Sequence, residues 1–135
     1  MNTSIALLEA HRLMAQGLSN WIRKDFEEYE LLFVAESRQD LLDHLDQNQI
    51  PEILLLDDYR QEVGGLEIIQ ILNAQYSAIR ILVYTINTTE ELIDKMIRAG
   101  ARGYLDKGCS QLELKQAIDT IRTKGFYYSD FLPNR

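Results

Sequence analysis

The feature that most constrains the fold is a regular alternation of short apolar runs with longer amphipathic segments. Between and after these runs, apolar residues recur at the three- and four-residue spacing of one helix face. Strands that are apolar on both faces, each followed by a helix, indicate a parallel sheet covered on both sides. The sequence therefore predicts an α/β protein with a doubly wound sheet of five parallel strands and five helices. The five expected strands lie at 4–8, 31–35, 53–56, 81–84 and 103–105.

Helix ends carry local signals that agree with this alternation. Thr88 with Glu91, and Ser110 with Glu113, have the spacing of capping boxes, in which a hydroxyl and a carboxylate each bond the backbone of the other residue. Gly125 suits the left-handed position that follows a helix. Two helices are therefore expected to begin after Thr88 and after Ser110, and the last helix to end before Gly125.

Length and composition restrict the class of protein. A chain of 135 residues suits one domain, and a hydrophobic content of 46% can supply a core. The net charge of −7 argues against an autonomous nucleic-acid binder. The single cysteine, Cys109, allows no internal disulfide, which fits a reducing cytoplasm, and the apolar runs are too short to span a bilayer. We expect an intracellular single domain that does not enter membranes.

Chemistry-bearing residues follow the expected strands, where parallel sheets bind their ligands. Glu9 follows the first strand, Asp57 and Asp58 the third, Thr85 the fourth and Lys107 the fifth. Such a set suits phosphoryl transfer to a carboxylate assisted by a hard cation. Asp57 would attack phosphorus, Lys107 would neutralise a phosphoryl oxygen and Thr85 would donate a hydrogen bond to another.

The order and spacing of several segments resemble a known family. The chain is similar, from Ile5 to about Asp130, to the receiver domains of two-component response regulators, and most similar to those of the NarL/LuxR type. The segments that carry this resemblance are 51–57, 65–67, 98–101, 103–107 and 125–129.

The resemblance implies a flavodoxin-like receiver fold with strand order 2-1-3-4-5 at residues 1–130, and a linker or tail at 131–135. It makes Asp57 the phosphoacceptor, with Lys107, Thr85 and Tyr104 as its phosphate-binding and switch residues. A sensor histidine kinase would supply the phosphoryl group in the cytoplasm, and the domain would be a switch rather than an enzyme. The output would be transcription. The protein would form a homodimer, and it would contact DNA only through a separate domain.

The same resemblance implies a Mg²⁺ site with one altered position. Its ligands would be Glu9, Asp57 and the backbone carbonyl of Tyr59, with Asp58 as a possible contributor. The family has two adjacent acidic residues after the first strand, and this chain has Glu9 followed by Ala10. Because Ala10 removes one oxygen and one negative charge, we expect weak Mg²⁺ binding.

Two other functions compete with this interpretation. A domain that works without phosphate, by constitutive dimerisation or by binding a partner, is favoured by Ala10. A small flavin or nucleotide enzyme on a similar sheet is disfavoured, because residues 9–12 form neither a glycine-rich nor a hydroxyl-rich phosphate loop.

Three further residues have ordinary structural interpretations. His11 is expected in a loop or at a helix start, and His44 on the solvated face of a helix. Cys109 precedes a helix, where its thiol is either mildly acidified or an inert surface group.

Overall fold

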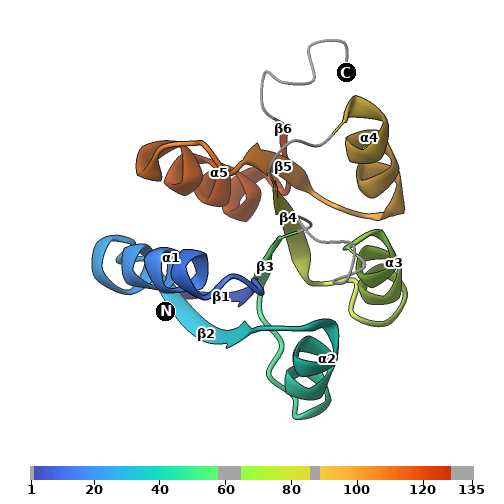
Figure 1. The fold of residues 1–135 in the computed structure, drawn as a ribbon, viewed down its shortest axis with the longest axis horizontal. Coiled ribbons are helices and arrows are strands. Elements are labelled where there is room, and N and C mark those ends of the chain that lie inside the picture. The colour runs from blue at the N-terminus through green and yellow to red at the C-terminus, as the bar shows by residue number, and fades with distance from the viewer. Residues whose placement is uncertain (1, 58–64, 86–88, 129–135) are drawn as a thin grey trace.

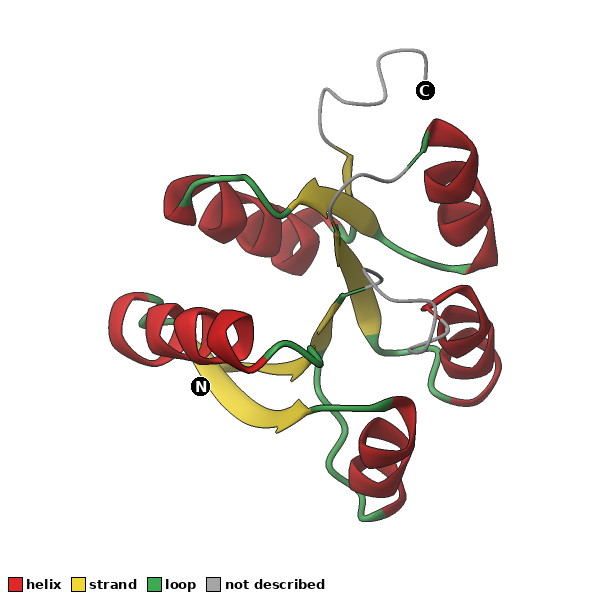
Figure 2. Ribbon diagram, in the orientation of Figure 1, coloured by secondary structure: helices red, strands yellow, loops and turns green. Residues whose placement is uncertain are grey.

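The computed structural model describes residues 2–57, 65–85 and 89–128. Its centre is a six-stranded parallel sheet with the strand order β2-β1-β3-β4-β5-β6. Helices α1 and α5 cover one face of the sheet, and α2, α3 and α4 cover the other (Figures 1 and 2). In chain order the elements are β1 (Thr3–Leu8), α1 (Arg12–Asp25), β2 (Tyr29–Ala35), α2 (Arg38–Asp46), β3 (Ile53–Leu56), α3 (Gly65–Gln75), β4 (Arg80–Thr85), α4 (Glu90–Ala99), β5 (Gly103–Asp106), α5 (Gln111–Lys124) and β6 (Tyr127–Tyr128).

The doubly wound sheet, its five helices and the strand order 2-1-3-4-5 are confirmed, but the expected strand number is wrong by one. The additional strand is β6, which runs parallel to β5 at the sheet edge. Gly125 ends α5 with a φ of 92°, and the chain then returns along β5, where the Tyr127 amide donates to the Arg102 carbonyl at 2.8 Å. Gly103 permits this approach because the Tyr127 carbonyl oxygen occupies the space that a side chain there would need.

The sheet separates two apolar clusters, one under each helical layer. Strand β3 shows how the sequence achieves this, since all four of its residues are buried. Leu54 and Leu56 face the layer of α2, α3 and α4, whereas Ile53 and Leu55 face α1 and α5. Each buried side chain of this size contributes about 1.5–3 kcal/mol. Side chains alternate between the two faces along a strand, so Asp57, the residue after Leu56, is directed to the α1/α5 side.

Helix starts agree with the sequence at α5 and differ at α4. The Ser110–Glu113 capping box is confirmed: the Glu113 amide donates to Ser110 Oγ at 3.1 Å, and the Ser110 amide donates to Glu113 Oε1 at 3.2 Å. At α4 the N-cap is Thr89, whose hydroxyl oxygen accepts from the Leu92 amide at 3.1 Å. The expected box at Thr88 is therefore wrong by one residue, because the extended backbone of Thr89 presents its own hydroxyl to the helix; Thr88 lies outside the described residues.

A membrane-spanning helix needs more length and apolar content than any helix in the described ranges has.

Candidate functional site

Three charged side chains meet at the carboxyl edge of the sheet. Lys107 Nζ lies 2.9 Å from Glu9 Oε1 and 3.0 Å from Asp57 Oδ1. Glu9 is 2% exposed and Asp57 is 4% exposed, so this single ammonium pairs with two carboxyl groups that are withdrawn from water. The structure thus joins residues that are 98 positions apart in the chain, Glu9 and Lys107, into a single cluster, which we call the acidic triad.

The hydrogen bonds between neighbouring strands continue one residue past the strand ends and fix the backbone of the three triad residues. The Glu9 amide donates to the Ala35 carbonyl at 2.9 Å, and the Asp57 amide donates to the Leu8 carbonyl at 3.0 Å. The Lys107 amide donates to the Thr85 carbonyl at 2.8 Å. Because a backbone hydrogen bond fixes each of these three residues, its side chain projects from a defined position at the sheet edge.

Burial and charge raise the pKa of Glu9 from 4.5 to about 7. Desolvation of the ionised carboxylate is the largest cause, and hydrogen bonding to Asp57 adds to it. The Lys107 ammonium opposes the rise, as does the His11 amide, which donates to Glu9 Oε2 at 3.1 Å. A carboxylate so placed gains from any further positive charge that reaches the triad.

Thr85 and Tyr104 lie on the other face of the sheet. Thr85 is 2% exposed. Because side chains alternate along β4, Thr85 lies on the same sheet face as Val83, and Val83 pairs with Tyr104 of β5. Tyr104 is also 2% exposed and belongs to the apolar cluster under α4 that contains Ile93 and Met96. Burial raises the pKa of Tyr104, and the nearby Asp106 adds to this rise. The expected switch pair thus shares one sheet face, beside the triad rather than within it.

The described part of the site matches Mg²⁺ in ligand type. Glu9 and Asp57 supply the hard carboxylate oxygens that Mg²⁺ prefers, whereas the methyl group of Ala10 supplies none. Within residues 2–57, 65–85 and 89–128, no three or more His, Cys, Asp or Glu side chains form a group that could hold a metal. The other expected contributors, Asp58 and the Tyr59 carbonyl, lie outside the described residues.

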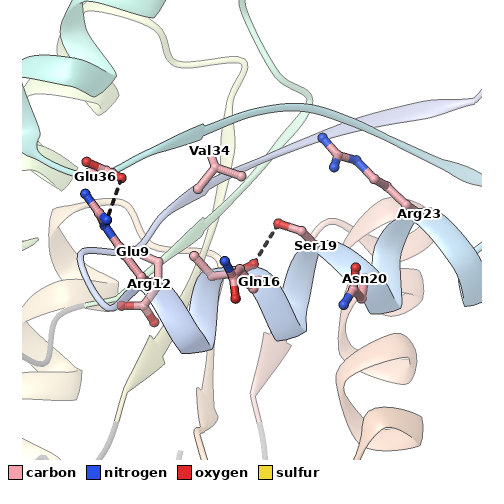
Figure 3. A pocket seen from close by; sticks show the side chains of 9 residues that line it. Glu9, Arg12, Gln16, Ser19, Asn20, Arg23, Val34 and Glu36 are labelled. Atoms are coloured by element: carbon pink, nitrogen blue, oxygen red, sulfur yellow. Dashed lines mark hydrogen bonds and ion pairs between the residues drawn. The ribbon is translucent and has the colours of Figure 1, made fainter.

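A polar groove of about 530 Å³ runs between α1 and β2 and reaches the triad at Glu9 (Figure 3). One end carries the ion pair between Arg12 and Glu36, whose atoms lie 3.9 Å apart. Sequence reasoning missed this groove because it followed the apolar stripe of the first helix. The available signal was the polar residues at helical spacing on the opposite stripe. The residues that line the groove are Glu9, Arg12, Ala15, Gln16, Ser19, Asn20, Arg23, Val34 and Glu36.

Packing decides two sequence interpretations outside the triad. Cys109 is half-buried, and burial together with Glu113 and Asp106 raises the pKa of its thiol to about 11, which contradicts an acidified thiol and agrees with an inert one. His44 is partly buried rather than solvated, because its ring stacks on Phe33 with the centroids 4.1 Å apart. His11 lies at the start of α1, as expected, and its side chain makes no capping hydrogen bond.

Comparison with protein families agrees with this geometry. Residues 5–119 match the model of the response regulator receiver domain. Transcriptional regulatory protein UhpA of Salmonella typhimurium is 29% identical over 126 residues, which cover 92% of this chain and 61% of the relative. Response regulator UvrY of Escherichia coli is 26% identical over 118 residues, which cover 87% of this chain and 53% of the relative. The chain thus spans little more than half the length of these relatives.

Solved structures show the same fold. A two-component response regulator of the LuxR family from Aurantimonas superposes with a TM-score of 0.84 at 26% identity, covering 96% of this chain and 90% of that chain. The isolated receiver domain of RcsB from Salmonella enterica, solved with phosphomimetic beryllofluoride, gives a TM-score of 0.83 at 16% identity. That match covers 98% of this chain and 97% of the other.

Proposed function

Given that this chain belongs to the response regulator receiver domain family, of the LuxR type, we propose that Asp57 accepts a phosphoryl group from a sensor histidine kinase and thereby switches an output. Receiver domains are signalling modules. The observation that carries the proposal is the buried Asp57 carboxylate, which Lys107 holds at 3.0 Å at the open edge of the sheet. A carboxylate oxygen in this position can act as the nucleophile toward phosphorus, with Lys107 beside it to offset negative charge on the phosphoryl group.

The transfer is a displacement at phosphorus. An Asp57 oxygen forms the new bond to phosphorus, and the bond to the donor histidine nitrogen breaks, so that the electron pair leaves with the imidazole. Lys107 then faces a phosphoryl group in place of a bare carboxylate and neutralises part of its charge. The Thr85 hydroxyl donates to a second phosphoryl oxygen, and Tyr104, on the same sheet face, changes its packing with Thr85.

Receiver domains generally bind Mg²⁺ at their acidic site. In this chain Glu9, Asp57 and the Tyr59 carbonyl would hold the ion, with Asp58 as a further contributor. A bound ion supplies positive charge to the phosphoryl oxygens during transfer. Because Ala10 leaves one ligand position to water, we propose that the affinity for Mg²⁺ is low.

The output that we propose is transcription in the cytoplasm. Residues 1–130 would form the receiver and residues 131–135 the beginning of a linker or tail. A homodimer would carry the signal, and DNA would be contacted only through a separate output domain. The names of the relatives support this, because UhpA is a transcriptional regulatory protein of which this chain matches only 61%.

Intact mass spectrometry tests the phosphoacceptor directly. The protein is incubated with a small phosphodonor and Mg²⁺, and we expect one phosphoryl adduct in wild type and none in Asp57→Asn. Asp106→Asn is the matched control, since it removes an exposed carboxylate at the same sheet edge. An unmodified wild type at high Mg²⁺ contradicts the proposal and favours the second candidate.

The second candidate is a receiver that acts without phosphate, as a dimerisation or partner-binding module. Two observations favour it: Ala10 removes a metal ligand, and Lys107 already supplies a positive charge that pairs with both Glu9 and Asp57. Sedimentation distinguishes the candidates. If beryllofluoride and Asp57→Asn both leave the monomer–dimer balance unchanged, phosphorylation does not control assembly.

A further inference from the structure

Tyr84 lies beneath the acidic triad and is not among the site residues expected from the sequence or from the family resemblance. Leu55 pairs with Leu82 and Leu56 with Val83, so one further step of the same register sets Asp57 beside Tyr84. Tyr84 packs in the α1/α5 cluster, the sheet face to which alternation directs Asp57. It is 2% exposed, so its ring forms part of the floor of the triad.

Tyr84 makes two contacts with Lys107. The Lys107 ammonium nitrogen lies over the Tyr84 ring, 5.9 Å from its centroid, within the range of a cation–π interaction. The Tyr84 hydroxyl lies 3.4 Å from the Lys107 carbonyl oxygen, which is the long end of hydrogen-bonding distance. The ring contact acts on the ammonium itself, whereas the hydroxyl contact acts only on the Lys107 backbone.

Burial strengthens the contact between the Tyr84 ring and the Lys107 ammonium. The Lys107 side chain is 8% exposed, and cation–π attraction is stronger when the cation is withdrawn from water. Burial also raises the pKa of Tyr84, and the neighbouring acidic groups add to this rise, so the phenol stays neutral. In a site where Ala10 weakens metal binding, Lys107 is the resident cation, and its position determines how well charge on Asp57 is neutralised.

We propose that the Tyr84 ring is a positioning residue for Lys107, which holds the ammonium over Asp57 for phosphoryl transfer. The proposal rests on the proposed function only in its last step, since the contact between the ring and the ammonium exists without phosphate. Removing the ring leaves only the ion pairs with Glu9 and Asp57 to place the Lys107 ammonium, whereas removing only the hydroxyl keeps the ring contact.

The test compares Tyr84→Leu, which removes the ring, with Tyr84→Phe, which keeps it. Phe26→Leu is the matched control, because Phe26 is a 1%-exposed aromatic residue in the same apolar cluster and lies at the far end of α1. The first readout is the rate of acyl-phosphate formation with acetyl phosphate as donor. We expect this rate to fall about tenfold in Tyr84→Leu, the scale of a desolvated cation–π contact, and to stay close to wild type in the other two.

The second readout is the NMR resonance of the Lys107 ε-methylene, assigned by its loss in Lys107→Arg. We expect an upfield ring-current shift in wild type, Tyr84→Phe and Phe26→Leu, and its loss in Tyr84→Leu alone. The proposal is overturned if Tyr84→Leu forms acyl phosphate as fast as wild type, if wild type shows no upfield shift, or if either of the other variants loses as much as Tyr84→Leu.

Failure of the proposed function, or failure of a variant to fold, can be distinguished from failure of this proposal. If wild type forms no acyl phosphate, the proposed function fails, and the ε-methylene shift alone then decides the role of Tyr84. If Tyr84→Leu does not fold, wild type still provides the test through a nuclear Overhauser effect between the Tyr84 ring protons and the Lys107 ε-methylene. Observation of that effect supports the proposal, and its absence overturns it.

Discussion

The pH dependence of folding stability should report the buried Glu9 carboxyl. Its pKa rises from 4.5 to about 7 on folding, so the folded protein binds this proton more tightly than the unfolded chain does. The stabilising contribution is therefore fully present below pH 4.5 and is lost as the pH rises through about 7. The interval between the two values corresponds to about 3 kcal/mol of unfolding free energy.

Glu9→Gln isolates this contribution, because glutamine keeps the shape of the side chain and does not titrate. Urea unfolding is measured from pH 4 to pH 9 with EDTA present for wild type, Glu9→Gln and Glu36→Gln. The last variant is the matched control, since Glu36 lines the same groove with 64% of its side chain exposed. We expect wild type to lose about 3 kcal/mol relative to Glu9→Gln between pH 4.5 and pH 8, and to run parallel to Glu36→Gln.

Parallel curves for wild type and Glu9→Gln would refute the reasoning. They would mean that Lys107, 2.9 Å from Glu9, fully offsets the desolvation of the carboxylate. A wild type that gains stability relative to Glu9→Gln as the pH rises would refute even the sign of the effect.

Three further predictions concern the metal, the edge strand and a helix cap. Ala10→Asp should raise Mg²⁺ affinity roughly tenfold or more by restoring a ligand oxygen, as measured by calorimetric titration; equal affinities would show that another oxygen already occupies this position. Gly103→Ala should displace β6, because the added methyl group meets the Tyr127 carbonyl oxygen. The Tyr127 amide should then exchange its hydrogen faster, and unchanged protection of this amide would contradict the prediction. Ser110→Ala should cost about 1 kcal/mol of stability in urea unfolding through loss of the capping box, whereas an unchanged midpoint would mean that Ser110 contributes nothing to α5.

The sequence by itself determined the layers of this protein and the location of its candidate site. Hydrophobic periodicity is local, so it identified the five principal strands and the five helices, and the capping box at Ser110 is a pattern of four residues. The rule that parallel strands present their carboxyl ends at one edge was enough to gather Glu9, Asp57, Thr85 and Lys107 there.

Tertiary structure alone decided how those residues meet. The contact of Lys107 with Glu9 joins residues 98 positions apart, and the raised pKa of Glu9 follows from burial that no local pattern encodes. Strand β6 is two residues long, too short for a periodic signal, and depends on the space that Gly103 leaves beside Tyr127.

The remaining differences have the same cause. The Cys109 thiol, the His44 ring and the Tyr84 ring each owe their character to packing against residues from other elements: burial against the α1/α5 cluster for Cys109, Phe33 for His44 and Lys107 for Tyr84. Periodicity shows which face of a strand or helix is buried, but not which side chain it is buried against. That choice is made when the helices pack on the twisted sheet, and it places an aromatic ring beneath the ammonium that neutralises Asp57.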